Sequence, residues 1–229
     1  MSFTLRSALL GAALFSTQAV AAEFSFVSGN PGPEAFGNSY AQTLGGLTTT
    51  VSAWSTTGRG GRYQTAELEI YNGFGMGVCN RDEGVNCSSI GNMHALDNMG
   101  ADDLILFRFS SSVRLDSLTL RQFGGDSDLS LWAGTGSLNL AGLKPAALGS
   151  ASPFNNNSSI NDIKTVDLSN FTGAYDWLAV SARLAQENDF AKLRTLNVQS
   201  VASPVPEADS WAMLLAGLGL VGFAARRRI

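Results

Sequence analysis

The chain has 229 residues, a length that suits one domain or at most two, and its 45% of hydrophobic residues exclude a disordered acidic tail. Its net charge of −4 at pH 7 argues against a nucleic-acid-binding protein, because such proteins carry a basic stripe. The single histidine excludes metal centres with several imidazole ligands and leaves one imidazole for acid–base chemistry.

Residues 1–21 have the features of a secretory signal peptide in the required order. Arg6 supplies the positive start, Ala8–Phe15 is a short apolar run, and Ala19–Ala21 fits the small-x-small cleavage rule. The sequence therefore predicts an N-terminal signal helix, with Ala22 as the first residue of the mature chain. A buried N-terminal helix is the alternative.

Residues 22–203 are predicted to form one exported domain that is rich in strands. Apolar residues alternate or run continuously over short segments, and Gly-, Ser- and Asn-rich stretches separate them as turns. This pattern predicts an all-β fold, a jelly-roll-like β-sandwich, with one short helix near Ala141–Leu148. The expected strands are Leu47–Trp54, Thr65–Tyr71, Asp103–Phe109, Val113–Phe123, Leu129–Trp132, Ile163–Leu168, Tyr175–Ala182 and Phe190–Val201.

Cys79 and Cys87 are the only cysteines of the chain. An exported protein meets an oxidising compartment, so the default prediction is a disulfide that closes a small loop. A metal pair or a redox pair is the alternative. Neither suits the spacing, because the cysteines do not form a C-x-x-C pair and a zinc site would need two more ligands.

The segment 79–132 concentrates acidic residues in two turns, each of which precedes an expected strand. Calcium takes six to eight oxygen ligands from carboxylates, amides and carbonyls, so two such loops meeting at one end of a sandwich would form a calcium site. Asp and Asn are also common in turns because they bond their own backbone, and this explanation needs no metal. The candidate ligands are Asp97, Asn98, Asp102, Asp126 and Asp128.

Two further groups of side chains each allow a functional and a structural interpretation. His94 could act as a base with Asp97 or Asp103 and with Ser88 or Ser89 as nucleophile, but the Gly-x-Ser-x-Gly motif is absent and a structural histidine is favoured. Four aromatic residues in strand patterns could stack on sugars, although core packing is commoner at such positions. These are Trp54, Trp132, Tyr175 and Trp177.

The C-terminal segment 204–229 has three parts. A short motif at 205–208 contains Pro206 and Glu207, and an apolar run over 211–225 follows it. Arg226, Arg227 and Arg228 close the segment. The run is predicted to be a transmembrane helix with its arginines on the cytoplasmic face, which leaves the segment before it exported.

These three parts resemble the PEP-CTERM sorting signal. The resemblance implies that an exosortase, a membrane enzyme, recognises the tail and passes the protein to the surface of a Gram-negative cell. Pro206 and Glu207 would be the recognition residues, and the three arginines the retention cluster. Ala208 departs from the family pattern, which usually has a second proline there. The segments 94–98, 102–103 and 126–130 resemble, more loosely, the ectodomain of one group of exosortase-dependent surface proteins.

The sequence therefore predicts a non-enzymatic protein that is first anchored by its C-terminal helix and then acts at the cell surface or in the matrix. Removing Arg6 and the charged residues of the tail leaves 11 basic and 17 acidic residues, a net charge of −6 for the exported part. The resemblance implies exosortase and exopolysaccharide as partners, and no nucleic acid is expected. A calcium-assisted carbohydrate-binding module is the first alternative, and a secreted hydrolase is the second.

Overall fold

The computed structural model describes residues 20–28, 39–83, 94–122, 125–156, 162–184, 186–201 and 208–226. The chain divides into two compact units, of which one holds residues 19–201 and all of the strands, and the other contains helix α1. The strand unit confirms the predicted all-β class. The predicted signal helix lies outside the described residues, apart from its last two positions.

Thirteen strands and two short 3₁₀ helices make up the described part of the strand unit. The 3₁₀ helices are η1 (Arg81–Glu83) and η3 (Pro145–Leu148), and η3 is the short helix expected near Ala141–Leu148. The strands are β1 (Ala21–Ser25), β2 (Ser39–Leu44), β3 (Leu47–Thr56), β4 (Tyr63–Thr65), β5 (Glu67–Tyr71), β6 (Gly75–Cys79), β7 (Leu96–Asp97), β8 (Asp103–Gln122), β9 (Leu129–Gly134), β10 (Ser152–Phe154), β11 (Ile163–Asp167), β12 (Tyr175–Ala182) and β13 (Phe190–Ser200).

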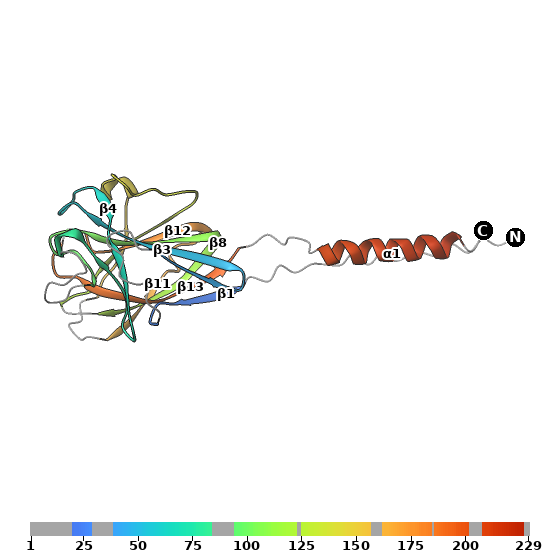
Figure 1. The fold of residues 1–229 in the computed structure, drawn as a ribbon, viewed down its shortest axis with the longest axis horizontal. Coiled ribbons are helices and arrows are strands. Elements are labelled where there is room, and N and C mark those ends of the chain that lie inside the picture. Colours follow the sequence, from blue (N-terminus) through green and yellow to red (C-terminus); the bar gives the residue numbers. More distant parts are fainter. Residues whose placement is uncertain are drawn as a thin grey trace. The chain divides into compact units, whose positions relative to one another are not determined.

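The long strand β8 joins the two parts of the domain. The sequence predicts separate strands at 103–109 and 113–123, but they form one strand of 20 residues. The first half of β8 pairs with β3 and β12, and the second half pairs with β13 and β11. Figure 1 shows β3 and β12 on one side of the domain and β11, β13 and β1 on the other.

The predicted jelly-roll-like sandwich is not confirmed, because the pairing links all thirteen strands into one sheet through this shared strand. Ser110–Ser112 separate the two apolar halves of β8, and the register of β12 shifts between Tyr175 and Trp177 beside them. Such an irregularity lets a strand bend while most of its ladder is kept. The Ser112 hydroxyl donates to Asp176 Oδ1 at 2.6 Å and fixes the same corner.

One cluster of buried apolar side chains draws on both parts of the sheet. It contains Val51 of β3, Phe107 of the first half of β8, Leu118 of the second half and Leu196 of β13, each 0% exposed. A second, smaller cluster contains Trp54, Trp132, Leu104, Leu106 and Ala179. Fully burying a side chain of this size stabilises the fold by about 1.5–3 kcal/mol. Trp54 and Trp132 are therefore core residues, and the alternative of a sugar-stacking platform does not apply to them.

Helix α1 (Ala208–Arg226) covers the predicted helical run 211–225. Its large apolar side chains between Leu214 and Phe223 are all more than half exposed, and they carry no polar stripe. In the described part of the chain, no helix combines the length and apolar character that crossing a membrane requires. The transmembrane assignment of 211–225 is therefore not confirmed.

Candidate functional site

One of the two predicted acidic turns, at 126–128, is joined to the turn that precedes β13. Asp126 and Asp128 lie between β8 and β9, and Asp189 directly precedes β13. Carboxylate oxygens of these three residues all lie within 4.8 Å of one another. A parallel bridge holds the two turns together, because Asp126 N donates to Asn188 O at 2.8 Å and Phe190 N donates to Asp126 O at 2.8 Å.

Asn98 links this cluster to the loop before β8. Its Nδ2 donates to Asp189 Oδ2 at 2.6 Å and to Arg183 O at 2.7 Å, and its Oδ1 accepts from Asp189 N at 3.1 Å. Three of the five predicted calcium ligands, Asn98, Asp126 and Asp128, therefore converge. The sequence analysis missed Asp189, although it follows Asn188 directly before an apolar strand, as Asp126 and Asp128 stand before β9.

Hydrogen bonds and one guanidinium compensate part of the negative charge. Asp128 Oδ1 accepts from Asn156 N at 2.5 Å, and Arg183 Nη1 lies 3.6 Å from Asp128 Oδ2. Asp189 Oδ1 accepts from Asp128 N at 3.0 Å. Burial, and secondarily the charges of Asp128 and Asp126, still raise the pKa of Asp189 to about 6. The cluster thus offers oxygens to a proton or to a hard cation such as calcium.

The other two predicted ligands lie in different clusters. Asp102 Oδ2 accepts from Gly60 N at 2.9 Å, and Asp102 N donates to Thr56 Oγ1 at 2.8 Å, so this residue closes the turn after β3. Asp97 accepts from Met99 N at 2.9 Å, and its backbone N approaches Asp103 Oδ2 at 3.5 Å. Sequence proximity to Asn98 therefore does not bring Asp97 or Asp102 to the same site.

Asp97 belongs to a buried group of ionisable residues around Lys192. Burial raises the pKa of Asp97 to about 7, and burial together with the charge of Asp97 raises the pKa of Asp103 well above its ordinary value. Lys192 is 3% exposed, and burial lowers its pKa to about 8 although nearby carboxylates favour its charged form. Its Nζ donates to His94 O at 2.7 Å and lies 3.9 Å from the centroid of the Tyr71 ring.

His94 is placed by this group and not by a serine nucleophile. Its Nδ1 lies 3.3 Å from Glu69 Oε2, without the geometry of a hydrogen bond, and its ring centroid lies 5.3 Å from that of Tyr71. Burial, and then the charge of Lys192, lowers the pKa of His94. The carboxylate beside the imidazole is thus Glu69, where the hydrolase alternative expects Asp97 or Asp103. Ser88 and Ser89 lie outside the described residues.

The predicted disulfide and most of the predicted sorting residues fall outside the described residues. Cys79 is fully buried at the end of β6. Cys87 is not described, so the Cys79–Cys87 pairing stays a prediction. Arg226 is the last residue of α1 and is exposed, whereas Pro206, Glu207, Arg227 and Arg228 are not described.

Comparison with known families identifies the tail. Residues 204–228 match the family model described as the PEP-CTERM protein-sorting motif. The tail therefore carries a PEP-CTERM sorting motif, and the resemblance seen in the tail is confirmed. The match supports export and processing by an exosortase, and it covers none of the strands. No curated protein matches the chain.

Proposed function

We propose that this protein is a non-enzymatic component of the cell surface or matrix, delivered by exosortase and acting in the exopolysaccharide layer. The match of residues 204–228 to the PEP-CTERM sorting motif carries this proposal. The net charge of −6 of residues 22–203 supports a neutral or cationic partner. The setting of His94 against Glu69, Tyr71 and Lys192 supports a structural role for the only imidazole.

Substitution within the sorting motif tests this proposal. The double variant Pro206→Ala/Glu207→Ala removes both candidate recognition residues, and surface display of the full chain, measured by cell fractionation and surface labelling, is expected to be lost. The matched control, Pro153→Ala/Glu187→Ala, removes the same residue types from the exposed surface of the strand domain and keeps normal display. Normal display of the motif variant contradicts the proposal.

A calcium-assisted carbohydrate-binding module is the second candidate, and the convergence of Asp126, Asp128 and Asp189 favours it. A cation that binds the folded state alone raises the melting temperature by mass action. Millimolar calcium is therefore expected to raise the Tm of the full chain relative to a chelator. Asp189→Asn abolishes this shift, and Asp82→Asn, at an exposed position outside the cluster, preserves it. Equal Tm values with calcium and with chelator contradict this candidate.

A further inference from the structure

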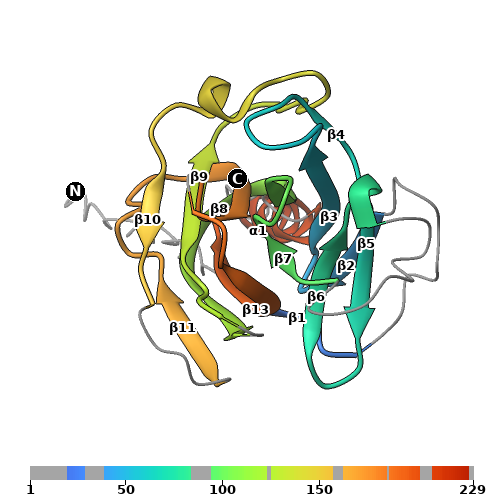
Figure 2. The same ribbon diagram turned by 90° about the vertical axis from the view of Figure 1, so that its left-hand side faces the viewer.

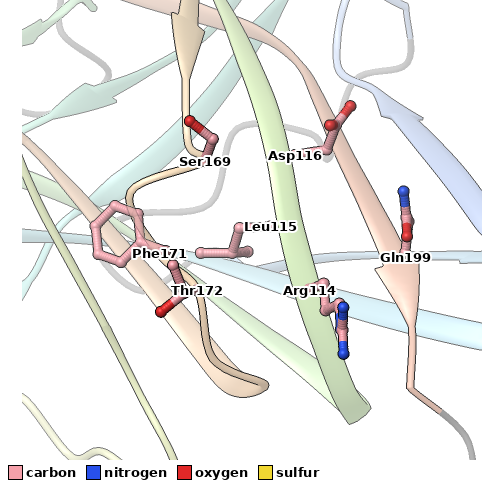
Figure 3. Close-up of a pocket in the computed structure, with 7 residues that line it drawn as sticks. All are labelled: Arg114, Leu115, Asp116, Ser169, Phe171, Thr172 and Gln199. Carbon is pink, nitrogen blue, oxygen red and sulfur yellow. The ribbon is translucent and has the colours of Figure 1, made fainter.

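A pocket of about 300 Å³ opens at the other end of β13 from the acidic cluster (Figure 3). Arg114, Leu115 and Asp116 of β8 form one part of its lining, and Gln199 of β13 adjoins them. The loop between β11 and β12 forms the rest, through Ser169, Phe171 and Thr172. Asp189 and Gln199 are ten residues apart on one extended strand, which separates the two sites by roughly 34 Å.

Backbone hydrogen bonds fix the loop that closes the pocket. Leu168 N donates to Asp116 O at 3.0 Å, and Phe171 N donates to Leu168 O at 2.9 Å. Gly173 N donates to the Tyr175 hydroxyl at 3.2 Å, and the Phe171 ring packs edge-on against Tyr175 with centroids 5.9 Å apart. The pocket is therefore preformed, and a ligand that enters it has little loop ordering to offset.

The polar side chains of the pocket have unused hydrogen-bonding capacity. Arg114 and Gln199 are directly opposite in the β8–β13 register, and Asp116 lies two residues further along β8 on the same exposed face. Among the described residues, none of these three side chains takes part in a hydrogen bond or an ion pair. A guanidinium, a carboxylate and an amide together offer several donors and acceptors in fixed planes.

The composition of this lining selects the kind of ligand. One positive and one negative side chain cancel, so the pocket has no charge with which to attract an ion. Leu115 itself is buried in the larger apolar cluster, so the apolar surface of the pocket comes from the half-buried Phe171 and from the aliphatic stem of Arg114. A ligand with both hydroxyl groups and C–H faces fits such a mixed surface. A neutral sugar has this chemistry, and the acidic domain around the pocket disfavours an anionic one.

The exposed sheet face beside the pocket continues the same chemistry across four strands. The register aligns four hydroxyl-bearing residues in one row, from β1 through β13 and β8 to β11. The next row contains an amide and a hydroxyl between two carboxylates, and it leads directly to Gln199 along β13. The first row is Ser25, Thr195, Thr119 and Thr165, and the second is Glu23, Asn197, Ser117 and Asp167.

We infer that the pocket binds one sugar unit of a neutral polysaccharide, whose chain continues over these two rows of polar side chains. The inference rests on the proposed function for the source of this polysaccharide, which is the matrix outside the cell. Neighbouring strands lie about 4.8 Å apart, so each row extends over roughly 14 Å, longer than a single sugar requires. The binding surface is therefore suited to a chain and not to a free monosaccharide.

Affinity gel electrophoresis of the full chain with a chelator present tests the inference. The probes are three neutral polysaccharides, dextran, galactomannan and xyloglucan, with alginate as the acidic contrast. At least one neutral probe is expected to retard the protein, and alginate is not. The double variant Asp116→Ala/Gln199→Ala lowers the affinity about tenfold, because two hydrogen bonds are lost. The matched control Asp82→Ala/Gln186→Ala, at exposed positions outside the pocket, retains it.

The outcomes separate this inference from the other proposals. Retardation by none of the neutral probes, or equal retardation of the pocket variant and the control, overturns it. Thr119→Ala, on the first hydroxyl row, is expected to weaken binding about threefold and to confirm that the chain crosses the sheet face. If the unmodified chain reaches the surface but binds none of the neutral polysaccharides, the sugar site alone is overturned. If it binds a neutral polysaccharide but does not reach the surface, the sorting proposal alone is overturned. Binding that requires calcium moves the ligand to the acidic cluster and contradicts the pocket.

Discussion

The two halves of β8 have the same backbone conformation and opposite surroundings. In the first half, Leu104 and Leu106 belong to the smaller apolar cluster, while Ile105 and Phe107 belong to the larger one, so both faces are buried. In the second half only one face is buried. Its other face presents Arg114, Asp116, Ser117 and Thr119 to solvent. Figure 2 shows β8 among the strands that it joins.

This difference separates a stabilising region from a recognising one. A strand that is buried on both faces has no position left for a ligand, whereas a half-exposed strand can carry polar groups on its outer face without loss of core packing. The proposed sugar pocket and both polar rows draw on the second half. Substitutions in the first half are thus expected to change stability, and outward substitutions in the second half to change binding.

The largest effect is expected from Phe107→Ala in the first half. Phe107 is 0% exposed, and truncating a buried phenylalanine lowers the free energy of unfolding by about 3–5 kcal/mol. Phe74→Ala is the matched control, because Phe74 is 41% exposed. The guanidinium carbon of Arg121, in the second half of β8, lies 4.8 Å from the centroid of the Phe74 ring. Its cost is about 1 kcal/mol or less. Urea unfolding measures both, and equal losses contradict the contrast.

The next largest effect concerns the predicted disulfide beside the start of β8. Asn80 follows Cys79, and its Nδ2 donates to Asp103 Oδ1 at 3.2 Å, so a crosslink here holds the chain next to the buried half. By the chain-entropy model a short closed loop contributes about 2–3 kcal/mol. Cys87→Ser is expected to lower the free energy of unfolding by this amount. Alkylation of both cysteines in the unfolded protein without prior reduction, detected by mass spectrometry, contradicts the pairing.

The third effect is a dependence of stability on pH, and it arises from the buried carboxyl of Asp97 near the start of β8. The pKa of Asp97 is about 7 in the folded state, above its ordinary value. The folded state therefore holds a proton that the unfolded state loses, and the stabilisation is complete below about pH 4 and lost as the pH rises toward 7. Asp97→Asn is expected to flatten this slope in urea unfolding between pH 4.5 and 6.5, and exposed Asp82→Asn is not. An unchanged slope in the Asp97 variant contradicts the assignment.

The parts of the fold that follow from local pattern were predicted, and those that depend on distant contacts were not. The Tyr175–Ala182 strand has the predicted bounds, because its apolar and β-branched residues suffice to define it. β6 was missed because Gly75 and Gly77 indicate a turn. A Cβ at Gly77 would lie 1.7 Å from the His94 carbonyl oxygen, so a close approach of two backbones requires glycine inside a strand.

The residues of the candidate site also fall into two groups, those that a local sequence pattern predicts and those that distant strand pairing brings in. Asp126 and Asp128 stand out in the sequence because two acids precede a strand. Asp189 joins them through a parallel bridge across more than sixty residues, and no local pattern encodes that pairing. The sugar pocket was also missed, since Arg114 and Gln199 meet only through the register of β8 with β13.

The smallest effects on stability concern two threonines, Thr119 in the second half of β8 and Thr49 of β3, which pairs with the first half. Thr119 Oγ1 lies 2.6 Å from Thr195 Oγ1 on the half-exposed outer face, so Thr119→Val leaves the remaining hydroxyl in contact with water and changes stability by less than about 0.5 kcal/mol. Thr49 pairs with Phe109 of the first half, is 0% exposed, and its hydroxyl has no hydrogen-bond partner among the described residues. Because an unsatisfied buried hydroxyl is costly, Thr49→Val is expected to raise the free energy of unfolding by about 1 kcal/mol. Urea unfolding of both variants measures the difference. A loss of stability in Thr49→Val would show that this hydroxyl is satisfied, and the two halves would then not differ at this position.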